Sequence, residues 1–271
     1  AHGYDFTEGF LSANNAQAPV FAHENPLRPG DGLTGIPTLL PDCIQLESAA
    51  GLAETEAFQQ GRFYIQDMAA RLAAMVGDAK PEMTVLDACA APGGKSVASA
   101  IMMRNRGRII SCDIHQKKLR LIKENAKRLG ILIIETREMD ARKPDEDLRG
   151  IADLVIADVP CSGLGVIRRK PEIRRKQPEE LDRLPGIQRD ILSGLAPCVK
   201  PGGVLLYSTC TIRKGENEET VQTFLVKHPE FFPEPFGTPV TGPVNTGMVT
   251  LWPHIHGTDG FFICKLRKQH D

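Results

Sequence analysis

The sequence predicts an α/β protein whose core is a doubly wound, mostly parallel sheet. From about residue 85 to residue 227, apolar runs typical of strands alternate with stretches of helical periodicity. Two of the runs, 154–157 and 204–207, are almost wholly apolar, as expected for strands covered on both faces. Strands that alternate with helices at this spacing are joined by right-handed crossovers and form a parallel sheet between two layers of helices.

The expected elements follow one another in a regular order. Residues 1–40 are rich in Gly, Pro and Asn and indicate loops with short strands. A helix is expected over 63–76, because Met68, Leu72 and Val76 fall on one side of it. After it we expect a strand opening at 85–86, a helix over 95–103, a strand over 108–112, a helix over 116–129 closed by Gly130, strands over 131–135 and 153–157, a helix over 187–199, a strand that follows a turn at 201–203 and ends at Thr209, a helix over 215–227, and a terminal pair of strands over 248–252 and 260–266. We divide the chain into a small N-terminal α+β subdomain, residues 1–75, and a larger domain, residues 76–271.

Composition excludes several classes of protein. Hydrophobic residues make up 41% of the 271 residues and charged residues 25%, which is ordinary for a globular chain with a sizeable core. No apolar run approaches the ~18 residues of a membrane span, and the first residues do not resemble a secretory signal. Seven cysteines without a Cys-x-x-Cys pair fit neither a disulfide framework nor a zinc site, and they indicate a reducing cytoplasm. None of the histidines has a metal-ligand spacing, so we expect no metal.

The net charge of −1 argues neither for nor against a nucleic-acid partner, but the basic residues are clustered. Segment 168–176 follows a candidate active-site loop and holds a single acid, Glu172. We expect its basic side chains to contact substrate phosphates: Arg168, Arg169, Lys170, Arg174, Arg175 and Lys176. A second basic cluster, 117–128, is interpreted as the solvated face of a helix.

A glycine turn after the first strand of the larger domain predicts a small-molecule site. The run CAAPGGK over residues 89–95 lets the backbone approach a ligand, and the helix N-terminus beside it offers free N–H donors. Asp113, Asp140 and Asp158 follow successive strands, and Asp113 is placed to accept hydrogen bonds from ribose hydroxyls. The pattern Gly-x-Gly-x-x-Gly is absent, which argues against NAD or FAD. A Walker phosphate loop is also disfavoured, because Cys89 replaces its first glycine and Pro92 stiffens the loop.

Two cysteines follow the two apolar strand runs. Cys161 lies in the run DVPCSG over 158–163, and Cys210 lies in STCT over 208–211. If both strands belong to one parallel sheet, both thiols emerge at its carboxyl edge, where open α/β sheets bind ligands. Two thiols and a cofactor loop at one edge suggest covalent catalysis. The lone cysteines elsewhere are expected to be packing residues: Cys43, Cys112, Cys198 and Cys264.

These motifs together resemble those of the RNA 5-methylcytosine methyltransferases, the NOL1/NOP2/Sun family. CAAPGGK, DVPCSG with Gly165, and Thr209-Cys210 occur in the family's order, and the runs VIRRKPEI at 166–173 and DGFF at 259–262 are similar to its bacterial Sun branch. The resemblance covers roughly residues 45–266. Ser96 stands where Thr is usual and Thr211 where Ser is usual, and both keep a hydroxyl.

The resemblance implies a Rossmann-like fold and S-adenosylmethionine as the methyl donor. It implies that the acceptor is carbon 5 of a cytosine in RNA, and we expect this RNA to be ribosomal RNA. It implies Cys210 as the nucleophile and Cys161 as the thiol that assists release of the product. It assigns cofactor binding to Cys89, Ala90, Ala91, Pro92, Gly93, Gly94, Lys95, Asp113, Asp140 and Asp158. The N-terminal segment, residues 1–75, is then expected to help hold the RNA.

The chemistry explains why such residues are needed. Carbon 5 of cytosine is a poor nucleophile, and a thiolate added at carbon 6 converts the ring to an enamine that can attack a methyl group. Either Lys95 or the arginines after Cys161 can supply a positive field that favours the thiolate, and Asp158 can hold the exocyclic amine or ring nitrogen. The base must be unstacked, so we expect a single-stranded or flipped-out cytosine. Separately, we expect the enzyme to be a monomer. Two alternatives stay open: transfer RNA as the substrate, or a non-catalytic RNA-binding assembly factor that keeps the fold.

Overall fold

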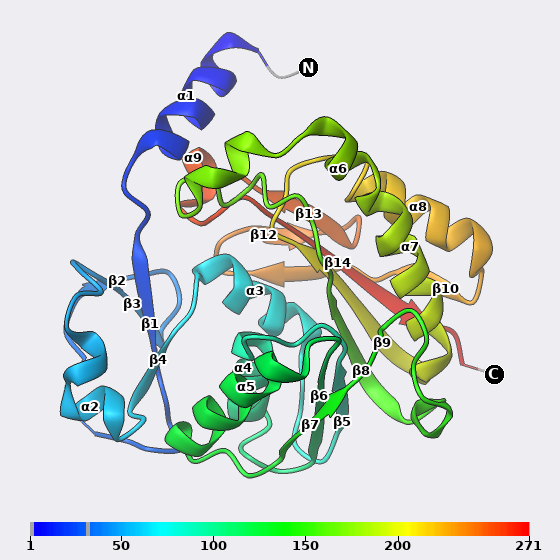
Figure 1. Cartoon of the computed structure of the whole chain (residues 1–271), viewed down its shortest axis with the longest axis horizontal. Coiled ribbons are helices and arrows are strands. Elements are labelled where there is room, and N and C mark those ends of the chain that lie inside the picture. Colours follow the sequence, from blue (N-terminus) through cyan, green and yellow to red (C-terminus); the bar gives the residue numbers. More distant parts are fainter. Residues whose placement is uncertain (1–2, 31–32, 271) are drawn as a thin grey trace.

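The computed structural model describes residues 3–30 and 33–270, and a large mixed sheet forms its centre (Figure 1). The strand order is β10-β14-β9-β8-β5-β6-β7, with β13 paired to another part of β14. The strands are β5 (Thr84–Asp87), β6 (Arg108–Asp113), β7 (Ile134–Glu138), β8 (Ala152–Asp158), β9 (Val199–Thr209), β10 (Phe231–Pro233), β13 (Met248–Leu251) and β14 (Phe261–Lys268). Strands β5 to β9 run parallel, and β14 is antiparallel to β9. The predicted doubly wound, mostly parallel sheet is confirmed.

Helices cover both faces of this sheet. One apolar cluster joins the sheet to α3 (Met68–Gly77), α4 (Gly94–Met102) and α5 (Gln116–Leu129), and a second joins it to α7 (Leu184–Leu195) and α8 (Glu218–Lys227). Neighbouring residues of one strand alternate between the two clusters, because successive side chains point to opposite faces. Leu206, for example, belongs to the first cluster and Leu205 to the second.

The N-terminal part forms a small antiparallel sheet of its own, at the left of Figure 1. Its strand order is β2-β3-β1-β4. The elements are β1 (Val20–Glu24), β2 (Ile36–Pro37), β3 (Cys43–Leu46), α2 (Glu56–Gln59) and β4 (Phe63–Ile65), with a 3₁₀ turn at Leu52–Glu54. Arg128 of α5 ties this sheet to the larger domain, because its guanidinium donates to the carbonyls of Phe58 and Phe63. The expected boundary at 75/76 falls inside α3, which packs on β9 and β14.

Two expectations for the N-terminal part were wrong. The first residues contain a helix, α1 (Tyr4–Asn15), whose Phe6 and Phe10 pack edge-on against Trp252. That helix is stabilised by a contact with the far end of the chain, which no local pattern reveals. The helix expected over 63–76 begins only at Met68, because the residues before it form β4 and the Asp67 carboxylate caps the helix by accepting the Ala69 N–H.

Other boundaries shifted by a few residues. β7 lies at 134–138 instead of 131–135. It is a polar strand at the edge of the sheet, and the apolar residues before it belong to the connection that follows α5, which ends at Gly130 in the left-handed conformation. α7 ends at Leu195, and β9 already begins at Val199, so the expected turn at 201–203 belongs to the strand. α8 begins at Glu218, three residues late. The remaining elements are α6 (Pro178–Asp182), β11 (Phe236–Thr238), β12 (Gly242–Val244), α9 (Pro253–His256) and 3₁₀ turns at Glu146–Leu148, Pro171–Arg175 and Ala196–Cys198.

Candidate active site

The sheet brings the predicted motifs to one edge. β5, β8 and β9 are parallel neighbours, and Asp158 at the end of β8 lies opposite Ser208 of β9. The loop after β5, residues 88–93, therefore meets the two loops that carry the cysteines. Gly93 in this loop has a φ of 106°, which glycine adopts without strain, and it lets α4 begin directly at Gly94.

A cavity of about 350 Å³ opens between these loops. It is lined by Cys89, Ala90, Ala91, Pro92, Gly94 and Lys95 of the predicted cofactor loop, by Asp87, Asp158 and Cys210 at the strand ends, and by Ile65, Gln66, Asp67, Ala70, Val166, Lys170, Asp259 and Phe261 from neighbouring segments. The predicted nucleophile and the predicted cofactor loop thus share one cavity at the carboxyl edge of the sheet.

The two predicted thiols lie against each other. The Cys161 and Cys210 sulfur atoms are 3.3 Å apart. A hydrogen bond from the Cys161 thiol lowers the pKa of Cys210, and the cations Lys95 and Lys170 act in the same direction against the opposing effects of burial and of Asp158. The same contact, together with burial, raises the pKa of Cys161. Of the two thiols, Cys210 is therefore the one that loses its proton more readily.

Lys95 and Asp158 form an ion pair at the rim of the thiol site. The Lys95 Nζ lies 2.6 Å from Asp158 Oδ2, while Ser208 Oγ donates to Asp158 Oδ1 over 2.8 Å. Lys95 is buried, and its ammonium also lies 5.1 Å from the centroid of the Phe261 ring. Its charge is thus held where it pairs with Asp158 and also lowers the pKa of Cys210.

Two buried acceptors in the cavity fit a cationic ligand. Asp87 Oδ1 and Gln66 Oε1 have no hydrogen-bond partner within residues 3–30 and 33–270, although both side chains line the cavity. Burial raises the pKa of Asp87 to about 7, and its other oxygen accepts the Ser96 hydroxyl over 2.7 Å. A ligand with an ammonium or sulfonium charge would satisfy these oxygens, so the residues present fit a sulfonium cofactor.

Three of the residues predicted to bind the cofactor are not among those that line the cavity. Gly93 faces Ile122 of α5. Asp113 is the buried last residue of β6, and its carboxylate accepts the His115 N–H over 2.8 Å. Asp140 follows β7 and pairs with Arg142, which lowers its pKa.

The predicted basic segment divides into an internal and an exposed part. Arg168 and Arg169 both pair with the buried Asp259, at 2.9 and 2.5 Å, and Arg169 also reaches Asp67 over 2.9 Å. Only 6% of the Arg168 side chain is exposed, so this guanidinium fastens the loop instead of facing solvent. The exposed part consists of Lys170, Arg174, Arg175 and Lys176, of which Arg174 donates to Asn15 and Lys176 to the Ser162 carbonyl.

Several residues of the cavity had no role assigned to them from the sequence, among them Asp87, Asp259, Phe261, Gln66 and Asp67. Asp87 ends a strand in the same way as Asp113 and Asp158, and that position was a usable signal. Asp259 and Phe261 belong to the quoted DGFF run. Gln66 and Asp67 come from the segment before α3, and no local pattern connects them to the site.

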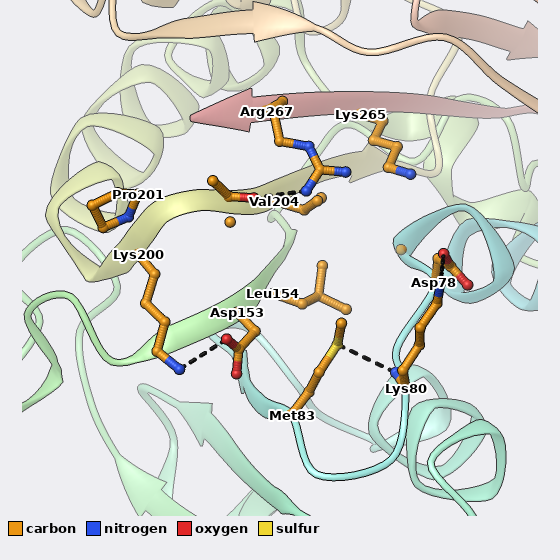
Figure 2. Close-up of a pocket in the computed structure, with 13 residues that line it drawn as sticks. Asp78, Lys80, Met83, Asp153, Leu154, Lys200, Pro201, Val204, Lys265 and Arg267 are labelled. Carbon is orange, nitrogen blue, oxygen red and sulfur yellow. Dashed lines mark hydrogen bonds and ion pairs between the residues drawn. The ribbon is translucent and has the colours of Figure 1, made fainter. Parts of the chain in front are cut away.

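A second hollow lies at the opposite, amino edge of the sheet (Figure 2). It has a volume of about 230 Å³ and is lined by cations that are already paired. Lys200 binds Asp153 over 2.8 Å, Lys80 binds Asp78 over 3.1 Å, and Arg267 and Lys265 both pair with Glu234. The hollow contains no cysteine and no strand end of the carboxyl edge, so we assign the chemistry to the first cavity.

Two features are absent from the part of the chain that the structure describes, a metal site and a membrane-spanning helix. Among residues 3–30 and 33–270, no group of three or more His, Cys, Asp or Glu side chains is placed to hold a metal ion. Within the same residues, no helix combines the length and the apolar character needed to cross a bilayer.

The fold and the cavity define a Rossmann-like protein of the S-adenosylmethionine-dependent methyltransferase class, with a paired-thiol site. More specifically, the chain belongs to the 16S rRNA methyltransferase RsmB/F family, whose model matches residues 74–267. The resemblance to RNA 5-methylcytosine methyltransferases of the Sun type is thereby confirmed.

Individual relatives agree with this assignment. The probable ribosomal RNA small subunit methyltransferase B of Bacillus subtilis is 45% identical, over 85% of this chain and 53% of the relative. The tRNA (cytosine(72)-C(5))-methyltransferase of Pyrococcus horikoshii is 36% identical, over 81% of this chain and 56% of the relative. This chain thus spans about half the length of these curated relatives.

Solved structures are similar to this one over most of its length. The crystal structure of NSun6 from Pyrococcus horikoshii with SFG superposes with a TM-score of 0.72 at 36% identity, covering 85% of this chain and 58% of that one. A methyltransferase homolog protein from Pyrococcus horikoshii gives a TM-score of 0.80 at 26% identity, covering 96% of this chain and 90% of that one.

Proposed function

We propose that the protein methylates carbon 5 of a cytosine in RNA, with S-adenosylmethionine as the methyl donor. The observation that carries the proposal is the pair of thiols, 3.3 Å apart, of which one lines a cavity that also contains the glycine loop. A relative named as a tRNA cytosine C5-methyltransferase and relatives named as ribosomal RNA methyltransferases support the reaction class.

The residues divide the reaction between them. The Cys210 thiolate adds to carbon 6 of the cytosine, and the electron pair displaced from the ring makes carbon 5 nucleophilic. Asp158 holds the exocyclic amine or ring nitrogen, which stabilises the charge that develops on the activated ring. After methylation a base removes the carbon-5 proton, the bond from carbon 6 to sulfur breaks, and Cys210 leaves as a thiolate. Cys161 assists this release from its position beside the Cys210 sulfur.

The cofactor residues follow from the cavity. Residues 89–95 and the α4 N-terminus would hold S-adenosylmethionine, and Asp87 and Gln66 would face its positive charge. Asp113 lies outside the cavity lining, and we keep it as the acceptor for ribose hydroxyls because it ends the next strand of the sheet. When bound, this cofactor supplies an electrophilic methyl group on a sulfonium centre. A structure of NSun6 from Pyrococcus horikoshii determined with SFG, an analogue of the cofactor, supports the choice of S-adenosylmethionine.

The substrate we favour is ribosomal RNA, supported by the ribosomal RNA methyltransferase relative from Bacillus subtilis. We propose that its cytosine is single-stranded or flipped out, because a base inside a duplex cannot reach a thiol that lines a cavity. Transfer RNA is the second candidate, supported by the transfer RNA relative from Pyrococcus horikoshii. We further propose a cytoplasmic monomer, in line with the free cysteines. A non-catalytic assembly factor is less well supported, because a pure RNA binder needs neither thiol.

The proposal is tested by incubating the protein with total RNA and methyl-labelled S-adenosylmethionine, followed by nucleoside mass spectrometry. Wild type is expected to place label in 5-methylcytosine, and Cys210→Ala is expected to abolish it. Cys198→Ala is the matched control and should retain activity, because this buried thiol belongs to the second apolar cluster and does not line the cavity. Cofactor binding without any labelled RNA would favour the non-catalytic function.

A further inference from the structure

Buried polar side chains lie between the two loops that carry the cysteines. Gln188 comes from α7, and Glu216 and Asn217 lie just before α8. All three are completely buried, although none belongs to the cavity. Fully buried polar groups are costly unless they are hydrogen-bonded, so the bonds that they make indicate what they stabilise.

Asn217 forms hydrogen bonds to the residues on both sides of the proposed nucleophile, Cys210. Its Oδ1 accepts the hydroxyl of Thr209 over 2.6 Å, and its Nδ2 donates to the carbonyl of Thr211 over 3.0 Å. These are the residues immediately before and after Cys210. One side chain therefore fixes the backbone on both sides of the thiol that attacks.

Glu216 and Gln188 do the same for the second thiol. Glu216 Oε2 accepts the Ser162 N–H over 2.8 Å and the Gln188 amide over 3.0 Å. Gln188 Nε2 also donates to the Pro160 carbonyl over 3.0 Å. The residues on both sides of Cys161 are thus held by this pair.

The hydrogen bonds beside Cys210 and those beside Cys161 are connected to each other. Glu216 and Asn217 are consecutive residues, and the Tyr207 hydroxyl donates to the Glu216 carbonyl over 2.5 Å. The Ser162 and Thr211 hydroxyls form a hydrogen bond of 2.7 Å between the loops. Neither thiol loop can shift without breaking a buried hydrogen bond to the other.

We propose that Asn217 is a positioning residue that sets the distance between the Cys161 and Cys210 sulfur atoms, and with it the rate of nucleophilic attack. The catalytic meaning of this distance rests on the proposed function, but the positioning itself does not. A displacement of the attacking atom by about 1 Å costs on the order of 100-fold in rate. Asn217 does not line the cavity, so substrate binding should be unaffected by its replacement.

Two isosteric substitutions test the proposal. In Asn217→Asp the donor to the Thr211 carbonyl is lost and a carboxylate oxygen faces that carbonyl, so the backbone beside Cys210 must move. In Glu216→Gln an amide oxygen can still accept both bonds that Glu216 Oε2 accepts, and only the 3.7 Å pairing of Oε1 with Arg213 is lost, so it is the matched control. We expect Asn217→Asp to lower kcat about 100-fold with unchanged KM for S-adenosylmethionine, and Glu216→Gln to remain close to wild type.

The distance between the two sulfur atoms can also be tested without RNA, with an arsenical that binds two neighbouring thiols. Phenylarsine oxide bridges two thiols only when they are close together, and its binding to Cys161 and Cys210 is measured by mass spectrometry of the intact holoprotein. Binding is expected to weaken in Asn217→Asp and to persist in Glu216→Gln. Wild-type kcat and wild-type arsenical binding in Asn217→Asp would overturn the proposal.

A variant that fails to fold and a failure of the proposed function can both be told apart from a failure of this proposal. If Asn217→Asp fails to fold, Thr209→Val removes only the hydroxyl that donates to Asn217, and unchanged arsenical binding and kcat in that folded variant would overturn the proposal. If wild type binds the arsenical but methylates no RNA, the proposed function fails, while the arsenical comparison still decides whether Asn217 positions the thiols.

Discussion

At the scale of single residues, the site depends on an asymmetry between two identical side chains. Cys210 has a lowered pKa because it receives a hydrogen bond from Cys161 and lies near Lys95, and Cys161 has a raised pKa for the complementary reason. A thiolate is needed for attack on carbon 6, and a thiol beside it is available at the release step. The sequence predicted that these two cysteines emerge at one edge of the sheet, but not that their sulfur atoms are 3.3 Å apart.

Lys95→Met tests the electrostatic part of this asymmetry. Lys95 lowers the Cys210 pKa and Asp158 raises it, so the variant removes the cation and leaves the opposing carboxylate. The pKa of Cys210 is expected to rise, and the acid limb of the pH–rate profile should move to higher pH. The measurement is the pH dependence of Cys210 alkylation by iodoacetamide.

Asp158→Asn is the informative control for Lys95→Met. It removes the carboxylate that opposes the thiolate, so alkylation of Cys210 should become easier at low pH while RNA methylation falls. An Asp158→Asn protein with full methylation would contradict the role that we give to Asp158 in holding the cytosine.

At the scale of elements, the sequence was most informative where local signals coincide with tertiary structure. The helix at 116–129 was predicted with both ends, because its apolar spacing stops at a glycine that adopts the left-handed conformation. The helix at 4–15 was missed because Phe6 and Phe10 find their apolar partner at Trp252. Contacts between distant parts of the chain also explain why Gln66 was not expected at the cavity.

The basic segment 168–176 also depends on contacts with distant residues, which its local charge pattern could not reveal. Six cations in nine residues predicted a phosphate-binding loop, and the charge pattern could not distinguish Arg168 and Arg169, whose partner Asp259 lies ninety residues away. Their ion pairs hold the loop after Cys161 against the DGFF run and, through Asp67, against the start of α3.

Asp259→Ala is expected to destabilise the protein by about 3 kcal/mol, because it leaves two arginines without the carboxylate that both share, one of them buried. Urea unfolding measures this change. Glu172→Ala, which removes an exposed acid from the same loop, should leave stability close to wild type. Equal stability of the two variants would show that the Asp259 pairs do not hold the loop.

At the scale of the whole molecule, a neutral chain must still bind a polyanion if the proposed function is correct. The net charge is −1, so RNA affinity has to come from local clusters. Arg175 is exposed, and within the described residues its guanidinium has no acidic partner, so it is free to meet a phosphate.

Arg175→Gln is therefore expected to weaken RNA binding and to reduce the slope of log affinity against log salt by about 0.7, the contribution of one phosphate contact to a single strand. Binding is measured across a salt series by filter retention. Arg120→Gln on α5 is the control, because Arg120 pairs with Glu124 on the face that we interpret as solvated. An unchanged slope in Arg175→Gln would remove this residue from the RNA interface.

The most direct test of the central claim is whether RNA becomes covalently attached to one cysteine when the other is removed. Cys161→Ala is incubated with its RNA substrate and S-adenosylmethionine, and the protein–RNA adduct is separated on a denaturing gel and mapped by mass spectrometry. We expect an adduct that accumulates in Cys161→Ala, is attached at Cys210, and is absent from Cys161→Ala/Cys210→Ala. An active Cys161→Ala enzyme without an adduct, or an adduct at any other residue, would contradict the division of roles between the two thiols.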